Sequence, residues 1–174
     1  MKWLFGFLLI IGSIAEARLE VRFMELRDAH GRLVQLEPGG RFGHVAVGIG
    51  GKWLHVHPYR GVELVNRETV EKVGCMVSSI LVEHLDEPDF LTVQTWLGLP
   101  YDRDFSWKSE DAFYCSELVG KILGLEPEPM TFDPRLWPPQ FQKFDGEPGL
   151  SPDDLYRLLL EKGHHATEVQ ACAP

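Results

Sequence analysis

The sequence predicts a single α+β domain in which an antiparallel sheet packs against about three helices. The first half of the chain alternates apolar and polar residues in short runs separated by turn residues, as the strands of an antiparallel sheet do. The second half holds capped segments with apolar residues three and four positions apart, as helices do. Residues 18–174 are long enough to form one domain with its own core.

The first 17 residues predict a secretory signal peptide. Lys2 precedes the apolar run WLFGFLLIIGSI, and the small residues Ala15 and Ala17 stand where a signal peptidase recognises its site. The run is shorter than the roughly 18 to 20 apolar residues that span a bilayer, so we expect no stable membrane insertion. We therefore expect residues 18–174 to be a periplasmic or secreted monomer.

The first half of the chain predicts two hairpins and two further strands. Residues 19–37 form a hairpin around the turn residues DAHG. HVAVGI and KWLHVH predict a second hairpin that turns at Gly50 and Gly51. A two-residue turn of the primed type needs positive φ, which glycine adopts readily. GVELV at 61–65 and CMVSSILVEHL at 75–85 are further strands, and the polar segment between them is a short helix.

Three longer helices follow in the second half. They are Pro88–Leu97 with Pro in its first turn, Cys115–Leu123 with Gly124 as its stop, and Ser151–Glu161 with a Ser cap. Residues 125–150 hold six of the twelve prolines and several aromatic residues, which makes a regular helix or strand there unfavourable. They predict an ordered covering loop whose aromatic side chains complete the core, or alternatively a wall of the substrate groove.

The turn at Gly50 and Gly51 sets the register of the second hairpin. Counting outward from it places three histidines on one face of the sheet, since alternate side chains of a strand share a face. These are His44, His55 and His57. The small residues of HVAVGI leave room beside them for a bulky group.

Cys115 begins a predicted helix, where unpaired backbone N–H groups and the positive end of the dipole favour a thiolate. A thiolate is the nucleophilic form of cysteine, and an adjacent imidazole would extend the effect by forming an ion pair. His44 is the candidate base. His55, diagonal to it across the hairpin, is the first candidate for holding its other ring nitrogen, and His57 is the second.

These segments also carry a family resemblance. YCSELV at 114–119, GLPYD at 98–102 and GHVAVGI ahead of them resemble the permuted papain-like amidases of the YaeF/YiiX type, relatives of NlpC-type cell-wall cysteine peptidases. The resemblance covers roughly residues 44–124. It implies a circularly permuted papain-like fold with Cys115 as nucleophile, His44 as base and a polar orienting residue on the next strand. It also implies that Tyr101 lies near the site, although Gly43 stands where relatives often have Ser.

We therefore expect an exported cysteine hydrolase that cleaves an amide or ester bond through an acyl-enzyme. Its partner would be a peptide, a peptidoglycan fragment or an acyl amide, and no cofactor or metal is required. The net charge of −9 and the lack of a basic stripe argue against nucleic acid. Two alternatives are zinc binding by the His44, His55 and His57 face, and a catalytically inactive binding module of the same fold.

The chain has three cysteines, and an exported protein meets an oxidising environment. Because the number is odd, at least one cysteine stays free or pairs between molecules. A bridge between Cys75 and Cys172 would leave Cys115 free, but the sequence does not establish that pairing.

Overall fold

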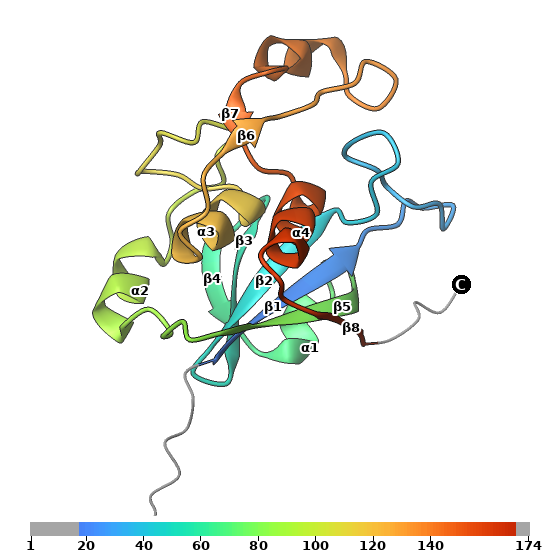
Figure 1. The fold of residues 1–174 in the computed structure, drawn as a ribbon. Coiled ribbons are helices and arrows are strands. Elements are labelled where there is room, and N and C mark those ends of the chain that lie inside the picture. Colours follow the sequence, from blue (N-terminus) through green and yellow to red (C-terminus); the bar gives the residue numbers. More distant parts are fainter. Residues whose placement is uncertain (1–17, 170–174) are drawn as a thin grey trace, which may run out of the picture.

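The computed structural model describes residues 18–169 (Figure 1). The predicted signal peptide and Cys172 lie outside these residues. The described part contains a six-stranded sheet in the order β4-β3-β2-β1-β5-β8, and every pairing in it is antiparallel. The strands are β1 (Arg18–Glu25), β2 (His44–Ile49), β3 (Lys52–His57), β4 (Gly61–Val65), β5 (Cys75–Glu83) and β8 (Ala166–Glu168).

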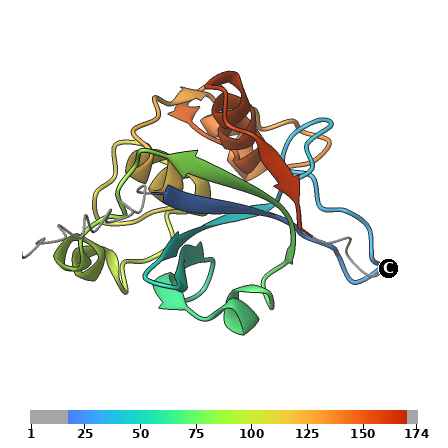
Figure 2. The same cartoon turned by 60° about the horizontal axis from the view of Figure 1, so that its bottom comes forward.

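Helices cover both faces of this sheet. Figure 2 shows the red helix α4 above the strands and the short α1 below them. The α-helices of residues 18–169 are α1 (Arg67–Val70), α2 (Phe90–Trp96), α3 (Cys115–Ile122) and α4 (Pro152–Glu161). An α+β class with an antiparallel sheet and a few helices is therefore confirmed.

The main core lies between the sheet and the pair α3 and α4. Leu19, Val21 and Phe23 of β1 face it and are fully buried, as their alternation predicted. Leu118 of α3 and Leu155 of α4 pack against the same cluster, and both are at most 1% exposed. The apolar stripes of these two helices thus supply the burial that stabilises the domain.

The second face of the sheet holds a smaller apolar cluster under α1. Ala46 and Trp53 of the second hairpin pack there with Val70 of α1 and with Met24 and Met76. The prediction of free space beside the small residues of β2 is therefore wrong, because the side chains of this cluster fill that space.

The predicted hairpin over residues 19–37 does not form. Asp28 does make a turn, accepting from the backbone N–H groups of His30 and Arg32, but only an isolated bridge joins Arg27 to Leu33. The reason is that β1 is a central strand, with β2 on one side and β5 on the other. No hydrogen-bonding edge of β1 is left for residues 33–37. The N–H of Val34 donates instead to the carbonyl of Leu26, beyond the end of β1, and the chain then runs in a loop to β2.

Two smaller differences concern the start of α2 and an additional strand. The helix α2 begins after Asp89, whose carboxylate accepts from the N–H groups of Leu91 and Thr92, so Pro88 precedes the cap instead of lying in the first turn. Strand β8 was not predicted and adds to the outer side of β5. The capped start of α4 at Ser151 matches its prediction.

Residues 125–150 form an ordered excursion above α3, seen at the top of Figure 1. It contains the short pair β6 (Glu128–Pro129) and β7 (Pro148–Gly149) and the 3₁₀ helix η1 (Pro139–Phe144). Its aromatic side chains cluster around Phe105, whose ring centroid lies 5.3 Å from that of Phe132 and 5.9 Å from that of Trp137. Trp137 also donates from Nε1 to the carbonyl of Leu36 at 2.5 Å, which ties the excursion to the 26–43 loop.

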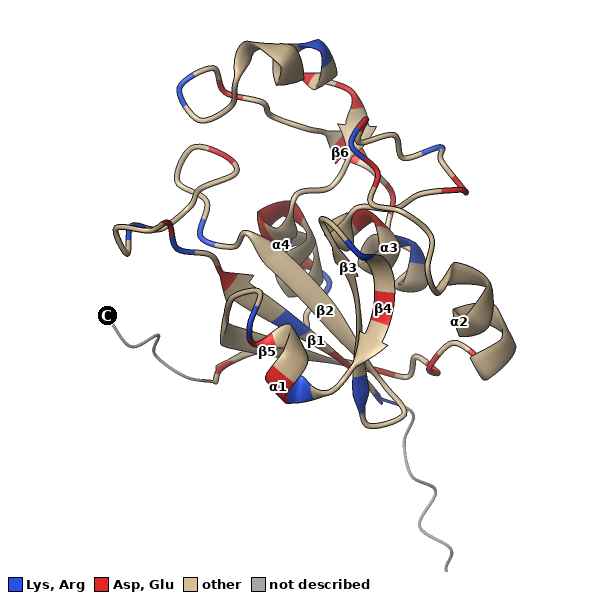
Figure 3. Cartoon of the chain, turned by 180° about the vertical axis from the view of Figure 1, so that it is seen from behind, with Lys and Arg blue, Asp and Glu red and all other residues tan. Residues whose placement is uncertain are grey.

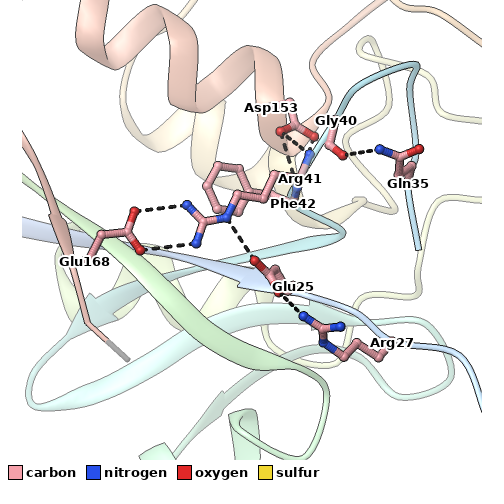
Figure 4. A network of polar contacts seen from close by, with 8 residues as sticks. All are labelled: Glu25, Arg27, Gln35, Gly40, Arg41, Phe42, Asp153 and Glu168. Carbon is pink, nitrogen blue, oxygen red and sulfur yellow. Dashed lines mark hydrogen bonds and ion pairs between the residues drawn. The ribbon is translucent and has the colours of Figure 1, made fainter. Parts of the chain in front are cut away.

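A polar network fixes the chain just before His44 (Figure 4). Asp153 in the first turn of α4 accepts from the backbone N–H of Arg41 at 2.8 Å and from that of Phe42 at 3.2 Å. The Arg41 guanidinium in turn contacts Glu25 of β1 and Glu168 of β8. The start of β2 is therefore held by three separate elements.

Among residues 18–169, no helix has the length and apolar character that crossing a bilayer requires. Seen from behind, Lys and Arg residues are interspersed with Asp and Glu along the loops and helices (Figure 3).

Candidate active site

A cavity of about 190 Å³ lies where the excursion, the 26–43 loop and the start of α3 meet. Cys115, His44 and Tyr101 all line it. The structure thus brings three residues that are far apart in the sequence to one hollow. Its remaining walls are mainly apolar and include Leu26, Leu36, Met130, Phe132, Trp137 and Leu150.

Cys115 is the first residue of α3 and is 6% exposed. The turn is held by Glu117, whose carboxylate accepts the backbone N–H of Tyr114 and pairs with Lys121 at 2.8 Å. Burial raises the pKa of Glu117 to about 7, while the contact with Lys121 favours its charged form. This fully buried carboxylate anchors the helix start.

The predicted resting thiolate is not supported. Burial raises the pKa of the Cys115 thiol to about 11, although the N–H groups of Val45 and Ser116 donate to the sulfur and favour the charged form. Desolvation therefore outweighs the helix start. Since Val45 follows His44 directly, the same contact places the sulfur beside the first residues of β2.

Alkylation of Cys115 by iodoacetamide should therefore be slow at neutral pH. With a pKa of about 11, the thiolate is about one part in ten thousand at pH 7, and the rate should rise about tenfold per pH unit from pH 6 to 9. Mass spectrometry of the Cys115 peptide measures this rate. In the chemically unfolded chain the same rate should level off near pH 8.5 to 9, and a plateau below pH 7 in the folded protein would contradict the buried-thiol assignment.

His44 and His55 are joined by a hydrogen bond of 3.0 Å between Nε2 of His44 and Nδ1 of His55. Both rings are buried, at 3% and 0% exposure. Burial, followed by the nearby His55 and His57, holds the pKa of His44 well below its usual value. Burial likewise lowers the pKa of His55 to about 4, so both imidazoles are neutral at pH 7.

The geometry separates the two candidates for orienting His44. His57 is only partly buried, and its Nδ1 accepts the backbone N–H groups of Tyr59 and Arg60. His55 is the residue that contacts His44. The diagonal pairing deduced from the turn is thus present, with Ile49 opposite Lys52 as counted.

Tyr101 follows the loop after α2 and lines the cavity with Cys115. A parallel bridge to Phe113, just before α3, holds it there. Burial, followed by the charge that Cys115 would carry, raises the pKa of Tyr101, so the phenol keeps its proton and can donate a hydrogen bond.

Sequence reasoning missed Glu63 on β4. Its Oε1 lies 3.0 Å from Nε2 of His55, which it faces directly in the β3–β4 register. A signal was present, because Glu63 interrupts the otherwise apolar strand GVELV. Extending the hairpin count across the next turn would have placed it opposite His55.

The states of Cys75 and Cys115 agree with the alternative in which Cys75 is bridged and Cys115 stays free. Cys115 is free and buried, and Cys75 is disulfide-bonded. The partner proposed for Cys75 lies outside the described residues. Cys115 therefore keeps a free thiol at the wall of the cavity.

Comparison with known proteins gives one informative match. No family model matches the chain, and no curated protein does. The structure is similar to the crystal structure of the metalloprotein yiiX from Escherichia coli O157:H7, DUF1105, with a TM-score of 0.60 and 20% identity. The match covers 91% of this chain and 98% of that one. The chain has the yiiX fold. This likeness agrees with the α+β class and with the resemblance of the sequence segments to YiiX-type proteins.

Proposed function

We propose that the protein is an exported cysteine hydrolase of the permuted papain-like type, which cleaves an amide or ester bond. One observation carries the proposal: the free thiol of Cys115 shares a cavity with His44, whose ring is held by His55. A thiol or hydroxyl is activated when a base lies beside it and an orienting group holds that base in place.

The reaction starts from a neutral thiol and a neutral imidazole. As Sγ of Cys115 attacks the substrate carbonyl, His44 takes the thiol proton, so charge separates only when the bond forms. His44 then returns the proton to the leaving amine or alcohol, and a thioester remains on Cys115. Water, deprotonated by His44, attacks the thioester and releases the acid and the thiol.

Two donors are available for the oxyanion of each tetrahedral intermediate. The backbone N–H of Cys115 lies at the start of α3, where helix N–H groups have no intrahelical acceptor. The protonated Tyr101 hydroxyl belongs to the same cavity wall. Preorganised donors of this kind supply a large share of the rate in acyl transfer.

The cavity favours a compact apolar acyl group. Its walls are mainly aliphatic and aromatic, and a dry apolar cavity of roughly 150 Å³ in another protein binds benzene. A volume of about 190 Å³ therefore accepts one ring or a short branched chain. An acyl amide or a peptide with an apolar residue at the scissile carbonyl fits this description.

A metal-centred function is less well supported in this chain. Residues 18–169 contain no group of three or more His, Cys, Asp or Glu side chains placed to hold a metal ion. His44 and His55 use their facing nitrogens on each other, and His57 uses Nδ1 on backbone N–H groups. Among residues 18–169, the zinc alternative therefore has no fitting donor set at these histidines, although the similar protein yiiX is a metalloprotein.

Trapping of the acyl-enzyme tests the hydrolase. The full chain is incubated with short-chain p-nitrophenyl esters, acyl amides and muropeptides. The intact mass of the protein is then measured, and peptide mapping locates any added mass. We expect an added acyl mass on the Cys115 peptide that hydroxylamine removes, because thioesters react with it. Protein already alkylated at Cys115 is the control and should form neither adduct nor product.

Product release without any thioester on Cys115, or equal release from the alkylated protein, would refute the cysteine mechanism. Absence of both product and adduct across the panel would favour the inactive binding module of the same fold.

A further inference from the structure

We propose that Glu63 is a positioning residue of the thiol site, which fixes where the protons lie on His55 and His44. The inference rests on the proposed cysteine mechanism and adds a fourth member to it. Glu63 lies on the edge strand β4 directly opposite His55, and its Oε1 is 3.0 Å from Nε2 of that ring.

Nε2 of His55 is buried and has no well-aligned hydrogen-bond partner in the described part of the chain. The Glu63 oxygen is within hydrogen-bond distance of Nε2 but lies off the line of the N–H bond. Because an unpaired buried N–H is unfavourable, we regard Glu63 as its acceptor despite the imperfect angle. The side chain of Glu63 is 19% exposed and can adjust.

Glu63 is an obligate acceptor. Arg60 donates to both of its oxygens, at 2.8 Å and 2.5 Å. This pairing lowers the pKa of Glu63, so the carboxylate is ionised at neutral pH and has no proton to donate.

The proton position on His55 then determines the proton position on His44. A carboxylate at Nε2 requires a proton on that nitrogen, so neutral His55 has its lone pair on Nδ1. In the 3.0 Å bond between the rings, Nε2 of His44 must therefore donate. Neutral His44 is left with its lone pair on Nδ1, the nitrogen that can accept the thiol proton.

During attack the proton moves from Sγ of Cys115 to Nδ1 of His44, and no proton passes on to His55 or Glu63. Without the carboxylate, His55 can carry its proton on Nδ1 instead. His44 would then accept at Nε2 and hold its own proton on Nδ1, where it cannot act as a base. Glu63 thus excludes an inactive arrangement of the pair.

Glu63→Gln tests this role, because the amide has the same shape and can either donate or accept. We expect kcat to fall about 10- to 100-fold with KM within about twofold. The matched control is Glu71→Gln, which also removes a carboxylate paired with an arginine, here Arg67 at 2.6 Å, but lies outside the histidine chain. It should leave kcat within about twofold.

Nitrogen-15 NMR of histidine-labelled protein provides a readout that a merely structural role would not move. In the wild type we expect His44 and His55 each to be protonated at Nε2 and bare at Nδ1. In Glu63→Gln part of the population should switch to the opposite tautomer. The signals are assigned by their loss in His44→Gln and His55→Gln.

A wild-type His44 protonated at Nδ1 would overturn the proposal, and so would Glu63→Gln with unchanged tautomers and rate. The NMR measurement needs no substrate, so it tests Glu63 independently of hydrolysis. If Cys115 proves dispensable for activity while the tautomers follow Glu63, the proposed function fails and the positioning of the imidazoles stands.

Discussion

Replacement of Cys115 by alanine is expected to lower kcat/KM by at least about 10³-fold, and His44→Ala should cost a similar factor. Alanine at 115 removes the atom that forms the thioester. Alanine at 44 removes the imidazole that lines the same cavity as the Cys115 thiol, whose pKa is raised to about 11. A resting thiolate could react without a base, but this protonated thiol cannot.

The double variant should lose little beyond either single variant, because nucleophile and base act as one unit. Hydrolysis of the best ester or acyl amide from the trapping panel measures all three proteins. His57→Ala is the matched control, since His57 lies on the same strand as His55 but its Nδ1 accepts from the backbone N–H groups of Tyr59 and Arg60. We expect it to stay within about threefold of the wild type. Identical product profiles from the wild type and Cys115→Ala would reject the hydrolase.

The local part of this site could be predicted from the sequence. Gly50 and Gly51 both adopt positive φ, at 56° and 75°, as a primed turn requires. That turn fixes the register of the hairpin, and the register places His44 within reach of His55. The helix start at Cys115 likewise followed from local pattern.

The long-range part could not be predicted. The hairpin over residues 19–37 was misassigned because both edges of β1 pair with more distant segments, β2 and β5, and these pairings depend on how the whole sheet closes. The pKa of Cys115 depends on the excursion and loop that bury it, which no spacing near Cys115 reveals. The local pattern therefore predicted the residues near the Cys115 thiol, whereas the protonation state of that thiol depends on tertiary packing.

Gly61→Ala should destabilise the domain by about 2–5 kcal/mol, which is the second large effect that we expect. Gly61 has φ of 75°, where a Cβ costs about 1–2 kcal/mol. A Cβ there would also lie 2.0 Å from the carbonyl oxygen of Leu99. That oxygen cannot move freely, because it accepts the N–H of Val62 at 2.8 Å.

Gly98→Ala separates the two causes. Gly98 has a similar φ of 83°, but a Cβ there meets no atom within 4 Å, so it should cost only about 1–2 kcal/mol. Urea unfolding followed by circular dichroism compares the variants. The clash at Gly61 pushes on Leu99, two residues before Tyr101, so the remaining folded Gly61→Ala protein should also hydrolyse substrate more slowly. If Gly61→Ala and Gly98→Ala lose equal stability, the start of β4 must shift to accommodate the new methyl group at position 61. The close packing of β4 against the loop before Tyr101 would then not constrain the site.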